Sequence, residues 1–381
     1  MRILVAPDKF KGSLTAERAA NALARGARRI HPDASFVIRP IADGGEGTVD
    51  AFALASGGRI RDVAVQGPLG GEVRAPIAVL ESGSAVVEMA SASGLPLIEP
   101  SSESALLAHS RGTGELIRAA SQIENVSEVI VGIGGSASTD GGTGAARALG
   151  WRFLDASGEE LSLGGGDLHR LARIERPAVS PPNVSIVAAC DVNNPLIGGR
   201  GAARSFARQK GADDEGIARL ELGLETLVQV VRRDLGIDVT SIPSGGAGGG
   251  MGAGAVAFFG ATLELGFDLL ARASHLADEV KAADLVITGE GRIDETSLQG
   301  KAPIAIARLA QRHGTQCFAV AGDLQLANSE LRKNGVTSVV GLLQSGGGEL
   351  AERDPEAALE RAISGLLEKR LEKKQGRRLL R

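Results

Sequence analysis

Short apolar stretches alternate with amphipathic ones at both ends of the chain. Residues 2–7 (RILVAP) and 34–42 (ASFVIRPIA) read as strands, and a helical pattern runs between them from about residue 15 to 30. The pattern returns in residues 283–291, 315–323 and 336–348, again with helices between the strands. Because strands that alternate with helices favour parallel pairing, we predict a Rossmann-like, doubly wound α/β sheet.

The middle of the chain has a different pattern of apolar and polar residues. Residues 60–89 are short apolar runs joined by glycine-rich turns, which predicts a β-meander. A helix is expected over 213–235, where apolar residues recur on one face, with Asp213 as N-cap and Gly236 after its end. We therefore expect two domains: 1–60 with 270–381 as the Rossmann-like domain, and 61–269 as a second α/β domain with a mixed sheet.

Composition narrows the class of protein. The 381 residues carry a formal net charge of −4, with one tryptophan and no tyrosine, so nothing favours a nucleic-acid partner. The two cysteines are far apart and suggest neither a zinc site nor a disulfide. No apolar run is long enough for a leader or a membrane span, so we expect a cytoplasmic protein without a membrane partner. The basic tail, residues 369–381, reads as a solvated helix end.

Acidic residues gather where predicted strands end, the edge at which open α/β sheets bind ligands. They are Asp8, Asp43, Glu46, Asp140, Asp191, Glu290, Asp294 and Asp323. Since carboxylates without a His or Cys cluster suit a hard cation, Asp191, Glu290 and Asp294 are our candidates for holding Mg²⁺. Asp43 could accept a hydroxyl proton as general base.

Glycine-rich loops offer places for phosphate groups. The 53 glycines are not periodic but cluster in loops, and residues 132–150 form a strand end, a loop of glycines and hydroxyls, and a helix start. The expected nucleotide-binding residues there are Gly134, Gly135, Ser136, Ser138, Thr139, Asp140 and Gly141. In a second loop, 289–303, Lys301 could meet a phosphate, although the loop is not a Walker A motif. A third run, 243–260, fits either a close-packed helix start or a loop over an adenine.

Together these motifs resemble the bacterial glycerate kinases of the first type. The resemblance rests on APDKFKGSLTA, ADGGEGT, GIGGSASTDGGTG, CDVNNPL and TGEGRIDETSLQGKAP, in this order over nearly the whole chain. It implies two α/β domains with the active site in the cleft between them, and phosphorylation of D-glycerate by ATP and Mg²⁺, usually to 2-phosphoglycerate.

Within this resemblance, the substrate anions would be bound by Lys9, Lys11, Ser13, Arg292 and Lys301. Asp8 would orient a lysine or a metal-bound water, and catalysis would fall to Asp43, Lys9 and Asp191. The phosphorylated hydroxyl, the hinge and the oligomeric state stay open, with a homodimer as one assembly to test.

Two other functions are consistent with parts of the sequence. Gly132-x-Gly134-x-x-Ala137 matches a dinucleotide fingerprint with Asp155 beyond it, which would fit an NAD-dependent hydroxy-acid dehydrogenase. No histidine is positioned to serve as its base. A non-catalytic sensor of a sugar acid or nucleotide is the other alternative, although an anion sensor gains nothing from so many carboxylates.

Overall fold

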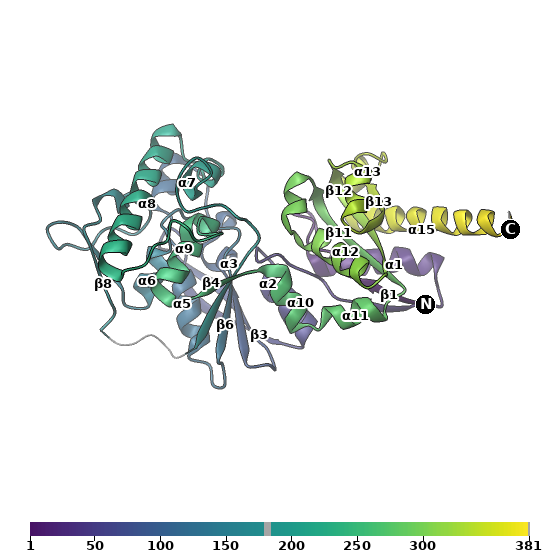
Figure 1. Ribbon diagram of the computed structural model, residues 1–381, viewed down its shortest axis with the longest axis horizontal. Coiled ribbons are helices and arrows are strands. Elements are labelled where there is room, and N and C mark those ends of the chain that lie inside the picture. Colours follow the sequence, from purple (N-terminus) through teal and green to yellow (C-terminus); the bar gives the residue numbers. More distant parts are fainter. Residues whose placement is uncertain (179–183, 380–381) are drawn as a thin grey trace. The chain divides into compact units, whose positions relative to one another are not determined.

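The chain folds as two compact units. One unit comprises Met1–Asp43 with Phe267–Arg381, and the other comprises Gly44–Gly266. The computed structural model describes residues 1–178 and 184–379 (Figure 1). The last two residues of the basic tail lie outside the described residues.

The first unit is built on a five-stranded, all-parallel sheet, which confirms the predicted doubly wound fold. Its order is β13-β12-β11-β1-β2. The strands are β1 (Arg2–Val5), β2 (Ser35–Ile38), β11 (Leu285–Ile293), β12 (Gln316–Leu324) and β13 (Val336–Gly341). The order reverses between β1 and β11, so the sheet has a topological switch point there.

Helices cover both faces of this sheet because successive side chains of a buried strand point to opposite sides. Ile3, Ile287 and Phe318 share a core with α1 (Ala16–Ile30) and α15 (Pro355–Leu379). The strand residues that alternate with these point to the opposite face of the sheet and are also buried. There α12 (Ala302–Arg312) contacts β11 and β12, and α11 (Leu276–Ala282) packs beside α12. The helix expected near 15–30 is α1, and its N-cap Thr15 accepts a hydrogen bond from the Arg18 N–H.

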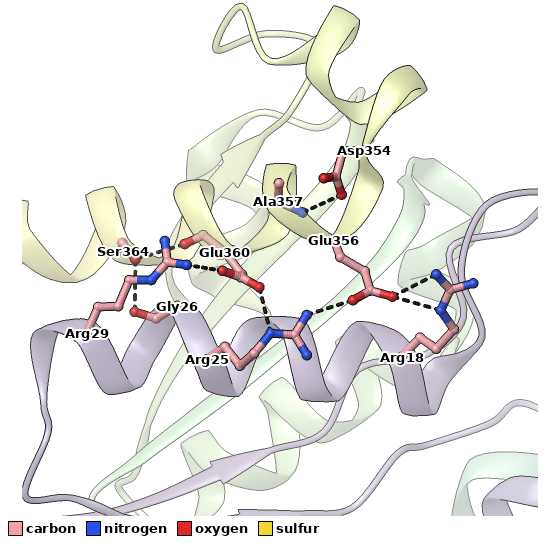
Figure 2. Close-up of polar contacts among 9 residues, drawn as sticks. All are labelled: Arg18, Arg25, Gly26, Arg29, Asp354, Glu356, Ala357, Glu360 and Ser364. Atoms are coloured by element: carbon pink, nitrogen blue, oxygen red, sulfur yellow. Dashed lines mark hydrogen bonds and ion pairs between the residues drawn. The ribbon is translucent and has the colours of Figure 1, made fainter.

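Ion pairs join α1 to α15, more than 300 residues later in the chain (Figure 2). Glu356 lies between Arg18 and Arg25, with both ion pairs at 2.7 Å. Glu360 lies between Arg25, at 2.6 Å, and Arg29. Because the arginines are exposed, these pairs contribute little stability individually, but they fix the register of the two helices.

The backbones of α1 and α15 approach closely at Gly26. A Cβ atom there would lie 2.6 Å from Ile363 Cγ2 and 2.8 Å from the Cα of Glu360, so only glycine fits. Ser364 Oγ donates a hydrogen bond of 2.8 Å to the Gly26 carbonyl at the same crossing (Figure 2).

The second unit contains a six-stranded mixed sheet, as predicted. Its order is β10-β9-β6-β5-β4-β3, parallel from β10 to β5 and antiparallel across β4 and β3. The strands are β3 (Arg59–Gln66), β4 (Glu72–Val79), β5 (Ser84–Glu88), β6 (Glu128–Gly132), β9 (Ser185–Cys190) and β10 (Thr262–Leu265). The expected meander over 60–89 is therefore β3, β4 and β5.

A long helix, α8 (Asp214–Leu235), supplies much of a second core in this unit. Asp213 caps it by accepting from the Gly216 N–H at 2.8 Å, and Gly236 ends it in the left-handed conformation. Leu220, Leu224 and Leu227 are buried against α9 (Ala247–Phe259) and the small β7–β8 sheet (Arg152–Leu154 and Arg173–Glu175). The predicted helix and its caps are confirmed.

The remaining helices are short. In the second unit they are α2 (Thr48–Ser56), α3 (Met89–Ser93), α4 (Ser102–Leu107), α5 (Arg111–Ser121), α6 (Thr143–Ala148) and α7 (Ala202–Phe206). In the first unit they are α10 (Gly266–Ala273), whose first residue ends the second unit, α13 (Asn328–Lys333) and α14 (Gly348–Arg353).

The division between the units differs from the boundaries expected from the sequence. The chain passes from one unit to the other at Asp43 rather than at residue 60. Helix α2 packs against β4 and β5, and β3 pairs with β4, so residues 44–60 belong with the six-stranded sheet. The βα pattern of this segment resembles the first unit's repeats, and only its packing partners distinguish it.

Candidate functional site

A cluster of carboxyl groups lies at the switch point of the five-stranded sheet. Asp8 follows β1, and its N–H donates a hydrogen bond of 2.8 Å to the Gly289 carbonyl on β11. Its side chain is 4% exposed, and its Oδ1 accepts from the Lys9 N–H at 2.6 Å. Burial, followed by the charge of Asp43, raises the pKa of Asp8 to about 8.

Glu290 is the second buried carboxyl of this cluster. It lies on β11 and accepts a hydrogen bond of 3.0 Å from Ser297 Oγ. Burial raises the pKa of Glu290 to about 7, although the charge of Lys301 and the bond from Ser297 act in the opposite direction. Two neighbouring acids that keep protons near neutral pH mark a place where a cation or a proton transfer would relieve the electrostatic cost.

Charged groups surround the two buried acids. Lys9 Nζ lies 3.9 Å from Asp43 Oδ1, and Lys301 Nζ lies 4.0 Å from Asp294 Oδ1. Asp294 also caps the turn that follows β11, accepting from the Thr296 N–H at 2.9 Å. The structure thus brings Lys9, Asp43, Asp294 and Lys301 together around Asp8 and Glu290.

Three other expected substrate-binding residues lie at the margin of this cluster. Lys11 and Ser13 are exposed on the turn before α1. The backbone of Lys11 runs beside Gly291, where a Cβ atom would be 3.1 Å from the Lys11 nitrogen. Arg292 Nε lies 3.3 Å from Asp323 Oδ2 and is more than half exposed. It therefore faces Asp323 rather than the buried acids.

The glycine-rich loop between β6 and α6 lies in the second unit. The side chain of Asp140 fixes its conformation through hydrogen bonds to the backbone. This carboxylate is fully buried and accepts from the N–H groups of Gly142 and Gly144 at 3.2 and 3.1 Å. Ser110 donates two further bonds, from N–H at 2.9 Å and from Oγ at 2.8 Å. Both carboxylate oxygens of Asp140 therefore accept hydrogen bonds within the protein, and Asp140 holds the loop and the start of α6 in place. A direct contact between Asp140 and a nucleotide stays a prediction.

A buried lysine that sequence reasoning missed lies under the same loop. Lys210 is 2% exposed, and its Nζ donates to Ser136 Oγ at 2.8 Å and to the Ser138 carbonyl at 2.5 Å. Burial lowers the pKa of Lys210 to about 7, with the charge of Asp140 acting to raise it. No motif in the sequence identifies this lysine, because it is more than 70 residues away from the loop along the chain.

The other loop residues differ in accessibility. Ser136 is 7% exposed, whereas Ser138 and Thr139 are fully buried, and their hydroxyls find no hydrogen-bond partner among the described residues. Gly134 donates its N–H to the Gly44 carbonyl at 3.0 Å, and Gly135 and Gly141 both have positive φ angles. A ligand on this loop would therefore meet backbone groups and Ser136 before the deeper hydroxyls.

The third glycine run is a close-packed helix start, one of the two expected forms. Gly248, Gly249 and Gly250 at the beginning of α9 all have positive φ angles. The Gly249 carbonyl accepts from the Gly141 N–H at 3.1 Å, and a Cβ on Gly249 would lie 2.9 Å from the Ser138 carbonyl carbon. This helix start packs directly against the loop of residues 134–141.

The expected magnesium ligands are divided between the two units. Asp191 follows β9 in the second unit, whereas Glu290 and Asp294 belong to the first. Among residues 1–178 and 184–379, no three acidic, His or Cys side chains form a group that could hold a metal ion by themselves. The donors nevertheless fit Mg²⁺, which one or two carboxylates hold together with substrate phosphates.

The dinucleotide fingerprint is not supported by the position of its acidic residue. Asp155 forms a turn after β7, accepting from the Ser157 N–H at 2.9 Å and the Glu159 N–H at 3.1 Å, and pairs with Arg170. In the part of the chain that the structure describes, no helix has the length and apolar content to cross a membrane.

The fold combines a five-stranded parallel sheet with a six-stranded mixed sheet. Buried acids beside ammonium groups at one switch point, together with a lysine-supported glycine loop, are features of an α/β enzyme that handles anionic substrates. Residues 3–369 match the Glycerate kinase family. The chain is 42% identical to glycerate 2-kinase of Escherichia coli K12 over 348 residues, 91% of each chain. It is 43% identical to glycerate kinase of Halalkalibacterium halodurans over 346 residues, 90% of each.

A solved structure agrees with these relatives. A crystal structure from Salmonella typhimurium LT2, which carries the provisional name glycerate kinase 2, has a TM-score of 0.82 and 40% identity, covering 98% of this chain and 99% of its own. The chain belongs to the glycerate kinase family and is a phosphotransferase. The kinase prediction is confirmed, and the dehydrogenase and sensor alternatives are set aside.

Proposed function

We propose that this enzyme transfers the γ-phosphoryl group of ATP to the 2-hydroxyl of D-glycerate, with Mg²⁺ bound to the nucleotide. The similarity to a relative named glycerate 2-kinase supports the product 2-phosphoglycerate. The observation that carries the proposal is the pair of buried acids, Asp8 and Glu290, at the switch point beside Lys9 and Lys301.

The charges of this cluster suit phosphoryl transfer, in which the protein mainly positions reactants and offsets negative charge. Lys9, Lys11 and Lys301 bind the glycerate carboxylate and the phosphates, with Ser13 and Arg292 at the margin. Asp43 accepts the hydroxyl proton as the oxygen bonds to phosphorus and the bond to ADP breaks. Lys9, whose Nζ lies 3.9 Å from Asp43 Oδ1, orients that carboxylate.

The second unit supplies a nucleotide cradle in this proposal. Gly134, Gly135, Gly141 and Ser136 offer backbone and hydroxyl donors, Ser138 and Thr139 shape the loop, and Asp140 positions it. Mg²⁺, when bound, would neutralise phosphate charge. In the first unit Glu290 and Asp294, and in the second unit Asp191, are the carboxylates proposed to bind it, directly or through water.

The test combines product identification with two variants. Wild-type enzyme should release ADP with D-glycerate in preference to other hydroxy acids, and ³¹P-coupled NMR should identify 2-phosphoglycerate. Lys9→Ala and Asp191→Asn should each lower kcat/KM by about a hundredfold or more while unfolding at the wild-type temperature.

Matched controls are Lys333→Ala, at an exposed lysine paired with Glu330, and Asp62→Asn, at an exposed position on β3. Both should keep kcat/KM within about twofold, as expected of surface positions. Formation of 3-phosphoglycerate would overturn the regiochemistry, and wild-type turnover of Lys9→Ala and Asp191→Asn would remove those residues from the mechanism.

A further inference from the structure

A groove of about 760 Å³ lies in the first unit, away from the carboxyl cluster. It runs beside the edge strand β13 and under α15, and the described residues that line it include none of the candidate site residues. Figure 1 shows α15 passing β13 on its way to the C-terminus. The volume is in the range of small-molecule sites in proteins.

The lining of this groove combines an apolar floor with positive charge. Phe318, Val340 and Leu366 contribute to the floor, while Arg332, Arg361 and Lys369 bring cationic side chains. The described residues that line it include no aspartate or glutamate. Among the described residues, none forms an ion pair with Arg332, Arg361 or Lys369, so the groove holds uncompensated positive charge.

Arg370 is a groove residue, and one nitrogen of its guanidinium group lacks a hydrogen-bond acceptor in the described part of the chain. Its guanidinium stacks 5.2 Å from the centre of the Phe318 ring, and Nη2 donates to Gln316 Oε1. Its Nη1 is buried and has no hydrogen-bond partner among the described residues. A buried charged donor without an acceptor is costly, and an anion in the groove would satisfy it.

The spacing of the cations indicates an elongated ligand. Arg361 and Lys369 lie eight residues apart on α15, which corresponds to about 12 Å along a helix. We propose that this groove is a binding site for an elongated small molecule that carries a phosphate, sulfonate or carboxylate group on an apolar body. Charge disfavours a second copy of the chain as the occupant, because two such grooves would repel each other.

The test uses 8-anilinonaphthalene-1-sulfonate, which has an anionic group on an apolar aromatic body. It should bind the folded protein with one saturable site and enhanced fluorescence, and saturating MgATP and D-glycerate should not displace it. The neutral N-phenyl-1-naphthylamine, with nearly the same apolar body, should bind at least about tenfold more weakly, because it cannot pair with the guanidinium groups.

Two kinds of variant locate the probe. The double variant Arg361→Gln/Arg370→Gln should weaken sulfonate binding by about tenfold or more, while Arg312→Gln, at an exposed arginine on α12, should leave it within twofold. Gly365→Leu should block the groove sterically. A Cβ on Gly365 meets no atom within 4 Å, so leucine enters open space and also favours the helix.

Gly365→Ala is the matched control for Gly365→Leu and should reduce binding only slightly. Cooperative unfolding of each variant, at or above the wild-type midpoint for the Gly365 variants, shows that the fold is intact. The proposal is overturned if Gly365→Leu and the double variant bind the sulfonate as tightly as wild type. Displacement of the probe by MgATP would also overturn it, since the probe would then occupy the nucleotide site.

Discussion

The buried carboxyl of Asp8 should make the enzyme less stable as the pH rises. Its pKa is about 8 in the folded chain and 3.8 as the reference value, so the folded state keeps a proton that the unfolded state releases. Between these two values, stability falls with pH by about 1.4 kcal/mol per unit. From pH 5 to pH 7, ionisation of the unfolded Asp8 alone costs the fold about 3 kcal/mol.

Asp8→Asn removes this titration without changing the shape of the side chain. Its Oδ1 can still accept from the Lys9 N–H, as the carboxyl does in wild type. The free energy of unfolding of the variant, relative to wild type, should therefore increase by about 3 kcal/mol between pH 5 and pH 7. Any offset between the two proteins that does not depend on pH cancels in this comparison.

Urea denaturation in EDTA and without nucleotide measures this difference, with far-UV circular dichroism at pH 5, 6 and 7. Trp151, the single tryptophan, lies in the second unit, so its fluorescence follows that unit separately. Asp33→Asn, at an exposed position of the first unit, is the charge-matched control and should show no such trend. If Asp8→Asn differs from wild type by the same amount at all three pH values, Asp8 is ionised in the fold and the reasoning fails.

Three further outcomes follow from the packing and charge described above. Gly26→Ala should destabilise the enzyme by about 1–3 kcal/mol in urea denaturation, because its Cβ would press on α15, whereas Gly365→Ala on α15 should not. Lys210→Met should lose about 2 kcal/mol of stability relative to wild type as the pH rises from 7 to 9, because the unfolded wild-type chain holds a proton in this range that the folded Lys210, with a pKa of about 7, has released. A relative stability that does not change between pH 7 and 9 would contradict a neutral, buried Lys210. Glu290→Gln should weaken Mg²⁺ binding, raising the Mg²⁺ concentration for half-maximal turnover about tenfold in a metal titration. An unchanged titration would exclude Glu290 from metal binding.

Much of the fold could be predicted because its signals are local. The apolar spacing of α8, its N-cap Asp213 and the left-handed Gly236 are all read within one segment. The meander was likewise predictable from short runs between glycine turns. The boundary at Asp43 was not, since α2 follows a strand of the first unit in sequence but packs in the second.

The candidate site was predictable in its residue types but not in its electrostatics. That Asp8 and Glu290 end up near the carboxyl edge follows from their place at the ends of parallel strands. Their raised pKa values depend on how completely neighbouring segments exclude water. Asp140 is a similar case, because its sequence context suggests contact with a ligand. The structure shows that Ser110, 30 residues away in the chain, donates two hydrogen bonds to the Asp140 carboxylate.

The sequence by itself therefore determined the strands, helices and turns, and the family to which the chain belongs, because periodicity, capping and long ordered motifs are properties of neighbouring residues. Only the tertiary structure decided that Lys210 supports the glycine loop, that Glu356 and Glu360 join α15 to α1, and that Arg370 lies in a groove without an anion. The physical reason is that burial and charge pairing depend on segments far apart in the chain, which no local pattern records.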